Sequence, residues 1–76
     1  SLGGFIMIDA RGYSCPEPVM MLRKAMFTKE DSYEILVDNR ISVENLTRYA
    51  GHNGYDTECK EEGEDFHLFI RKNEGK

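Results

Sequence analysis

The chain has 76 residues, the length of one small domain, and a formal net charge of −4 at pH 7. This acidic balance argues against direct binding to nucleic acid, which favours a basic domain or face. Two cysteines are too few for a disulfide scaffold, no leader-like apolar segment opens the chain, and no run approaches the roughly 20 residues of a membrane span. We expect a soluble cytoplasmic protein with reduced thiols, folded as one domain over residues 1–76. Residues 1–4 are expected to be a non-native or disordered start, and residues 73–76 a frayed tail.

The first part of the chain predicts a strand, a turn and a helix. Residues 5–9 are a short apolar run, which predicts a strand with both faces partly covered. Gly12 breaks this run and allows a turn. A helix is predicted from Pro16 to about Phe27, because apolar residues recur there at helical spacing. These residues are Val19, Leu22 and Met26.

The middle of the chain predicts a second strand and a second helix. Residues 33–38 are rich in consecutive apolar residues, which is typical of a central strand covered on both faces. The helix is expected to start at residue 41 or 42 and to end at residue 52 or 53, with Gly54 just after its C-cap. Its buried stripe is expected to contain Val43, Leu46 and Ala50.

The last third of the chain predicts a hairpin. Residues 55–60 and 66–71 each alternate apolar and polar residues, as half-exposed strands do. Residues 61–64 contain the glycine of a turn between them. Cys59 falls on the apolar side of this alternation, so we expect it to face inward and to be structural.

The order of these elements, β-α-β-α-β-β, predicts an α/β fold with two layers. Right-handed crossovers would place both helices on one face of a mixed four-stranded sheet. The other face would stay partly in contact with water, in keeping with the polar residues of the last two strands. Cys15 would then lie at the exposed carboxyl edge of the first strand, where open α/β sheets commonly bind ligands.

Cys15 stands at the start of the first helix and is followed by Pro16, Glu17 and Pro18. Proline is tolerated in the first helical turn and biases the preceding residue toward extended angles, so Cys15 is predicted to be the N-cap. A cysteine at a helix N-terminus has a lowered pKa, because the helix dipole favours the thiolate. The Glu17 N–H would be the main backbone donor to the sulfur, while the Glu17 carboxylate would oppose the thiolate. Together these features favour a reactive cysteine over a buried, inert one.

Other sites built on cysteine or histidine fit less well. The two cysteines and two histidines lack the short paired spacings of zinc ligands, so no metal site is expected. A thioredoxin-like Cys-x-x-Cys motif is excluded because Pro18 occupies the second cysteine position. A nucleophilic pair of Cys15 with His52 or His67 stays open, since such partners are distant in sequence. Both histidines are read more simply as surface residues.

The pattern Asp9-x-x-Gly12-x-x-Cys15-Pro16-x-Pro18 resembles the motif of the TusA/SirA family of small sulfur-carrier proteins. The resemblance covers about residues 6–72, and its later part looks most like the N-terminal domain of YedF-type members. It implies a two-layer α/β fold and a persulfide on Cys15. Arg11, four residues before the cysteine, is either a stabiliser of the thiolate or an ordinary surface charge. The supporting motif positions are Asp9 and Gly12 in the approach loop and Pro16, Glu17 and Pro18 at the helix start.

The function that the resemblance implies is that of a sulfurtransferase-type carrier rather than a multiple-turnover enzyme. Its partners would be proteins: a persulfide donor such as a cysteine desulfurase, and a sulfur acceptor. No cofactor, direct nucleic-acid contact or membrane contact is expected, and a monomer is the simplest expectation. Thiolated tRNA, a molybdenum cofactor or a selenium compound could each be the final product.

Two alternatives stay open at this point. The chain could be a non-catalytic interaction module that presents the Cys15 loop, with Met20 and Met21 beside it, to a regulatory partner. YedF-type proteins also carry a further C-terminal domain, so the 76 residues could be a fragment or a stand-alone form.

Overall fold

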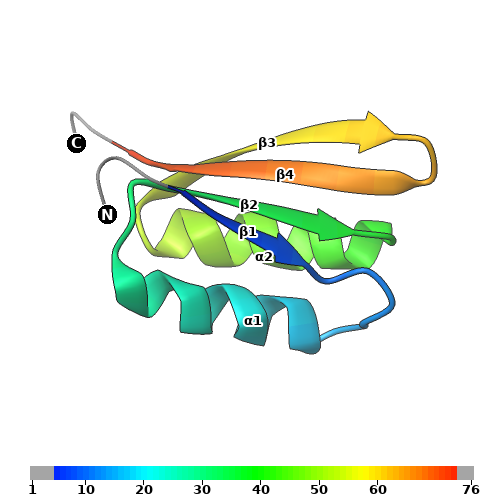
Figure 1. Cartoon of the computed structure of the whole chain (residues 1–76), viewed down its shortest axis with the longest axis horizontal. Coiled ribbons are helices and arrows are strands. Elements are labelled where there is room, and N and C mark those ends of the chain that lie inside the picture. The colour runs from blue at the N-terminus through cyan, green and yellow to red at the C-terminus, as the bar shows by residue number, and fades with distance from the viewer. Residues whose placement is uncertain (1–4, 74–76) are drawn as a thin grey trace.

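The computed structural model describes residues 5–73 (Figure 1). The predictions for residues 1–4 and 74–76 lie outside the described residues. Asn73, predicted to belong to a frayed tail, is hydrogen-bonded: its N–H donates to the Gly54 carbonyl at 2.8 Å, and its side chain donates to Asp56 at 3.3 Å. The elements are β1 (Phe5–Asp9), α1 (Glu17–Ala25), a short 3-10 helix η1 (Met26–Thr28), β2 (Ser32–Val37), α2 (Arg40–His52), β3 (Tyr55–Glu62) and β4 (Asp65–Lys72).

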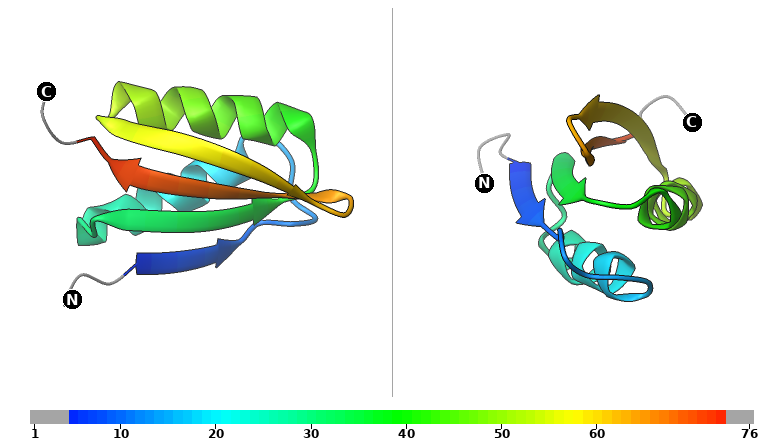
Figure 2. Two further views of the ribbon diagram at one scale, coloured as in Figure 1. Left: turned by 90° about the horizontal axis from the view of Figure 1, so that it is seen from above. Right: turned by 90° about the vertical axis from the view of Figure 1, so that its right-hand side faces the viewer.

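The four strands form one mixed sheet in the order β1-β2-β4-β3. β1 runs parallel to β2, and β4 lies antiparallel between β2 and β3. Both helices cover the same face of the sheet, as the end-on view shows (Figure 2). The predicted two-layer architecture is therefore confirmed. None of the helices in residues 5–73 is long and apolar enough to cross a membrane.

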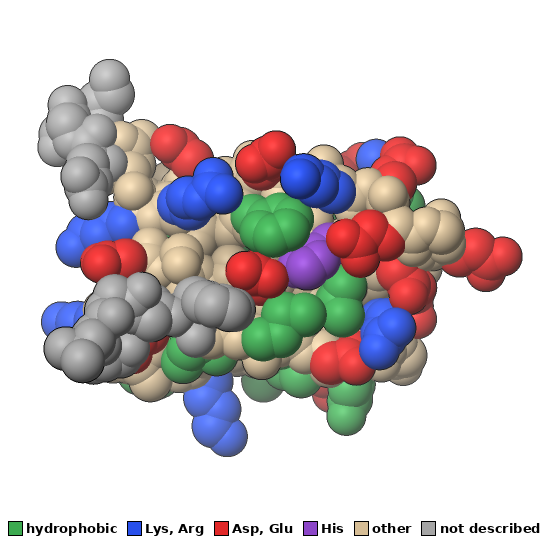
Figure 3. Space-filling model, turned by 45° about the horizontal axis from the view of Figure 1, so that its top comes forward, with side chains coloured by type: hydrophobic (Ala, Val, Ile, Leu, Met, Phe, Trp, Pro, Cys, Tyr) green, Lys and Arg blue, Asp and Glu red, His purple; other side chains and the backbone are tan. Residues whose placement is uncertain are grey.

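The core lies between the sheet and the two helices. Along β2, every second side chain is fully buried against the helices, namely Tyr33, Ile35 and Val37. The predicted coverage of this strand on both faces is wrong, because both helices pack on one side and leave the other face open. Charged side chains of both signs lie over that outer face, among a few hydrophobic ones (Figure 3). Met7 on β1, with 48% of its surface exposed, belongs to the same open face.

Helix α2 begins at Arg40, one residue before the earlier of its two predicted starts, residue 41. Asn39 is in an extended conformation, and its side-chain oxygen accepts the Ser42 N–H at 2.8 Å, which makes Asn39 the N-cap. The predicted stripe of Val43, Leu46 and Ala50 is buried. Gly54 follows the C-cap Asn53 with a φ of +83°, a conformation that glycine adopts without strain.

Cys59 is exposed, so the prediction that it is a structural residue is wrong, although its predicted inward direction is confirmed. Its register partner across the hairpin is Leu68, a buried residue, and Cys59 therefore does point to the helical side of the sheet. However, β3 is an edge strand, and only its first residues are partly covered. The rest of β3 continues to a hairpin tip that projects past the other elements (Figure 2), where no helix lies over it.

Candidate functional site

Cys15 is exposed at the end of the loop that joins β1 to α1. The chain turns just before the helix, where the Glu17 N–H donates to the Ser14 carbonyl at 2.9 Å. The first helical hydrogen bond runs from the Met20 N–H to the Pro16 carbonyl at 3.1 Å. Pro16 is therefore the N-cap, and the prediction that Cys15 would hold this position is wrong by one residue.

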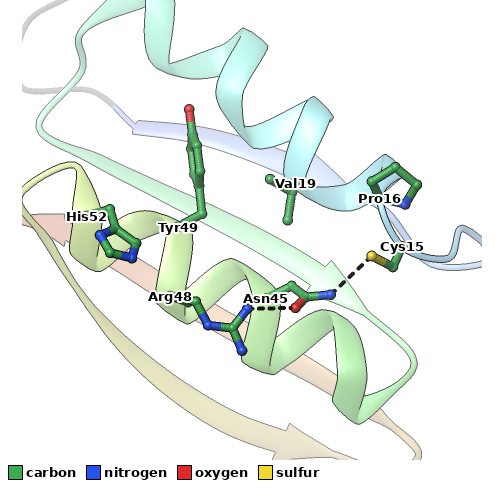
Figure 4. A pocket seen from close by; sticks show the side chains of 7 residues that line it. All are labelled: Cys15, Pro16, Val19, Asn45, Arg48, Tyr49 and His52. Atoms are coloured by element: carbon green, nitrogen blue, oxygen red, sulfur yellow. Dashed lines mark hydrogen bonds between the residues drawn. The ribbon is translucent and has the colours of Figure 1, made fainter.

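The hydrogen bond to the Cys15 sulfur comes from a different element than predicted. The Glu17 N–H is already used by Ser14. Instead, the side-chain amide of Asn45 on α2 donates to the Cys15 sulfur at 3.2 Å (Figure 4). The sulfur therefore faces an N–H donor that can stabilise negative charge on it.

Arg48 fixes the direction of that amide. One N–H of the Arg48 guanidinium donates to the side-chain oxygen of Asn45 at 3.1 Å (Figure 4). An asparagine side chain has one accepting oxygen and one donating NH₂ group. Because Arg48 engages the oxygen, the NH₂ group is the end that points at Cys15.

Sequence reasoning did not assign Asn45 or Arg48 to the site. The available signal was their spacing, since Asn45, Arg48, Tyr49 and His52 recur at three- and four-residue intervals beside the buried stripe of α2. Such a row lies along one side of a helix, next to its core-facing side. This spacing predicts that the four side chains share one side of the helix, but it does not predict which loop contacts that side.

A shallow groove of about 320 Å³ runs between α1 and α2, with Cys15 at one end (Figure 4). His52 stands toward the other end, seven residues along α2 from Asn45, which corresponds to about 10 Å of helix. Asn45 rather than a histidine therefore occupies the place beside the sulfur. The groove is lined by Cys15, Pro16, Val19, Asn45, Arg48, Tyr49 and His52.

His67, the other histidine considered as a partner, does not line this groove. It lies on the open face of the sheet, where its two ring nitrogens contact Glu34 at 2.9 Å and Glu62 at 3.2 Å. Its ring also stacks on Phe69, with ring centres 4.2 Å apart. In residues 5–73, no group of three or more histidine, cysteine or acidic side chains is arranged to hold a metal ion.

Asp9 and Arg11 form a clamp at the base of the Cys15 loop. The Arg11 guanidinium binds both carboxylate oxygens of Asp9, at 2.9 and 2.8 Å, and also contacts Asp65 at 3.1 Å. The hydrogen bonds from Arg11 lower the pKa of Asp9 to about 2, and they raise the pKa of Arg11. The clamp therefore ties the loop to the start of β4.

The charge of Arg11 is engaged by these two carboxylates. The hydrogen bonds of residues 5–73 include none between Arg11 and Cys15. The suggested role of Arg11 in stabilising a thiolate therefore stays a prediction without a direct contact.

Gly12 holds the next part of the loop. Its φ is +86°, in the region that favours glycine, and its N–H donates to Asp38 at 2.8 Å. This hydrogen bond is the main cause of the lowered pKa of the Asp38 carboxyl. The loop that carries Cys15 is thus anchored at the end of β2 as well as at β4.

The two cysteines differ in their surroundings. Both thiols are free and exposed. Burial of part of the Cys59 side chain raises the pKa of its thiol, which disfavours the reactive thiolate. Cys15 has the amide donor of Asn45 on its sulfur and a groove beside it.

Comparison with known proteins points to one family. A family model described as sulfurtransferase TusA matches residues 6–72. A protein of Methanocaldococcus jannaschii named "putative sulfur carrier protein" is 34% identical over 68 residues, which cover 86% of this chain and 91% of that protein. The crystal structure of a SirA-like protein from Desulfitobacterium hafniense superposes with a TM-score of 0.80 at 36% identity, covering 91% of this chain and 99% of the other. The special likeness to YedF-type proteins stays a prediction.

Proposed function

Because the chain belongs to the TusA family of sulfurtransferases, we propose that it carries sulfur as a persulfide on Cys15 and relays it between protein partners. The observation that carries this proposal is the setting of the Cys15 thiol. It is exposed, it accepts a hydrogen bond from Asn45, and it opens onto a groove that a partner can enter. A sulfur atom that must meet two different proteins in turn requires this kind of access.

The relay consists of two exchange steps without net oxidation or reduction. In the first, the Cys15 thiolate attacks the outer sulfur of a donor persulfide, R–S–SH. A Cys15–S–SH bond forms, the donor S–S bond breaks, and the donor leaves as a thiolate. In the second step an acceptor thiolate attacks the same outer sulfur and releases Cys15 as a thiolate.

The surroundings of Cys15 suit both steps. A cysteine is nucleophilic as a thiolate, and it leaves as a thiolate in the second step. The Asn45 N–H donates to the sulfur at 3.2 Å and would stabilise its negative charge in each case. Arg48 keeps that N–H in place by holding the amide oxygen.

Intact-protein mass spectrometry tests this proposal. The protein is incubated with a cysteine desulfurase and cysteine, and Cys15→Ser and Cys59→Ser are treated in parallel. We expect the wild type and Cys59→Ser to gain one sulfur, about 32 Da, that a reductant removes. Cys15→Ser should gain none. Cys59→Ser is the matched control, because it removes the other exposed thiol.

The proposal fails if Cys15→Ser takes up as much removable sulfur as the wild type. If no variant gains sulfur from several persulfide donors, the alternative of a non-catalytic interaction module is favoured instead. Exposed apolar side chains around the loop, such as Tyr13 and Met20, would then serve as the contact surface.

A further inference from the structure

The groove beside Cys15 differs in charge from the rest of the molecule. The whole chain has 14 acidic and 10 basic side chains. In contrast, the groove is lined by one arginine, Arg48, by His52 and by no carboxylate. An acidic protein therefore presents a locally basic surface next to its reactive cysteine.

Arg48 is free to bind an anion. Of the four other arginines, Arg11, Arg40 and Arg71 form ion pairs with carboxylates, whereas Arg23 forms none within residues 5–73. Within residues 5–73, Arg48 forms no such pair, and the one hydrogen bond recorded for its guanidinium goes to the uncharged Asn45 oxygen. Even Glu44, one turn earlier on α2, makes no ion pair with it. A guanidinium has five N–H donors, so most of them stay available.

The floor of the groove is apolar. Pro16, the N-cap of α1, and Val19 on α1 line one side, and Tyr49 lines it from α2. A volume of about 320 Å³ is at the low end for ligand pockets, and it accommodates one or two side chains rather than a folded surface. Its occupant should therefore be an extended segment with an apolar side chain.

We propose that this groove receives an extended, acidic segment of the partner protein, whose reactive cysteine meets Cys15. This inference rests on the proposed sulfur relay and adds the chemistry of the partner. Arg48 and His52 lie about 5 and 10 Å along α2 from Asn45, and an extended chain advances about 3.3 Å per residue. A carboxylate one to three residues from the partner's cysteine thus reaches Arg48 or His52, while a neighbouring apolar side chain occupies the floor.

Three synthetic peptides provide the probes for this segment. Each carries one cysteine, followed by isoleucine and then by glutamate, glutamine or lysine, and its cysteine is activated as a 2-pyridyl disulfide. The Cys15 thiolate attacks the peptide sulfur and forms a Cys15–peptide disulfide. The pyridine thiolate leaves, takes up a proton and is measured by its absorbance. The protein carries Cys59→Ser, so that only one thiol reacts.

The ratio of the glutamate and lysine peptide rates is the decisive quantity. A general change in Cys15 reactivity cancels in this ratio. The net charge of −4 acts at a distance and favours the lysine peptide, so a preference for glutamate has to come from the groove. We expect the glutamate peptide to react roughly threefold faster at low salt, as one charge pair in water allows, and less so at high salt.

Variants of Arg48 test whether this residue causes the preference for the glutamate peptide. Arg48→Gln keeps an N–H donor for Asn45 but removes the charge, and it should abolish the preference. Arg48→Glu should reverse it. Lys24→Glu is the matched control: it makes the same charge change on an exposed residue of α1 outside the groove, and the glutamate peptide should stay the faster one.

Two results overturn the inference: equal rates for all three peptides, or a preference that Arg48→Glu leaves unchanged. A small uncharged 2-pyridyl disulfide separates these results from a failure of the relay itself. If Cys15 reacts with this reagent but its rate does not depend on the charge of the peptide, only the proposal of an acidic partner segment is refuted. If Cys15 does not react at all, the proposed relay fails together with the segment.

Discussion

At the scale of single residues, the site depends on one hydrogen bond between distant parts of the chain. Asn45 and Cys15 are 30 residues apart, and their side chains meet at 3.2 Å. Arg48 orients the amide by holding its oxygen at 3.1 Å. The hydrogen bond to the thiol is thus donated from α2, although the cysteine belongs to the loop before α1.

Replacing Asn45 should slow the reactions of Cys15. In Asn45→Ala the sulfur loses its donor, and in Asn45→Asp a carboxylate of nearly the same shape faces the sulfur and repels a thiolate. We expect alkylation by iodoacetamide at pH 7 to slow about three- to tenfold in Asn45→Ala, and further in Asn45→Asp. Thr47→Ala, on the same helix but outside the groove, is the control. Unchanged rates in Asn45→Asp would show that the hydrogen bond has no influence on the thiol.

The clamp between Asp9 and Arg11 should make the free energy of unfolding depend on pH in the acidic range. The folded pKa of Asp9 is about 2, below its ordinary value of 3.8, so the folded state favours the charged form. Its contribution is present above about pH 3.8 and is lost as the pH falls toward 2. Asp9→Asn should therefore be less stable than the wild type in urea at pH 7.

The difference in the free energy of unfolding between Asp9→Asn and the wild type should shrink as the pH falls from about 3.8 toward 2. Glu44→Gln, an exposed carboxylate on α2, is the control and should follow the wild type. A constant difference between Asp9→Asn and the wild type from pH 7 to pH 2 would rule out the charge of Asp9 as its cause.

At the scale of elements, helix α2 supplies both a wall of the core and a wall of the groove. One stripe of its residues is buried against the sheet, and the adjacent row lines the groove with Asn45, Arg48, Tyr49 and His52. Both ends of α2 are defined by neighbouring residues. Asn39 caps its first turn, and Gly54 ends it in a left-handed conformation.

Two glycines at the end of α2 should respond in opposite ways to the same substitution. Gly51 lies in the last helical turn, where an added methyl group meets no atom within 4 Å, so Gly51→Ala should stabilise the protein by about 0.5–1 kcal/mol. Gly54 has a φ of +83°, so Gly54→Ala should cost about 1–2 kcal/mol. Urea unfolding of both variants measures these changes. A stabilised Gly54→Ala would contradict the left-handed end of the helix.

At the scale of the whole molecule, the two faces of the sheet have different surroundings. The helices lie on one side (Figure 1), together with the Cys15 groove between them, and the other side is open to solvent (Figure 3). The hairpin of β3 and β4 touches the cysteine loop through Asp65, which binds Arg11. The loop is therefore held by contacts from both the middle and the end of the chain.

Much of this fold could be predicted from local patterns, because helices and strands have different periods and prolines and glycines mark their ends. The strand Phe5–Asp9 has the predicted bounds, and the buried residues of α2 were identified correctly. The helix starts were wrong by one residue, and the larger errors concern contacts between elements. The exposure of Cys59 depends on how far along β3 the helices pack against the sheet. The hydrogen-bond donor to Cys15 depends on which residue of α2 contacts the loop. Neither is encoded in the spacing of neighbouring residues.

The measurement that tests the proposed relay most directly is to locate the transferred sulfur within the chain. The protein is loaded by a cysteine desulfurase, alkylated and digested with trypsin, which places Cys15 in residues 12–23 and Cys59 in residues 49–60. We expect the additional sulfur, about 32 Da, only in the peptide with Cys15, and we expect it to move to an added acceptor thiol. Sulfur found mainly on Cys59, or sulfur that stays on the chain when an acceptor is added, would contradict a relay through Cys15.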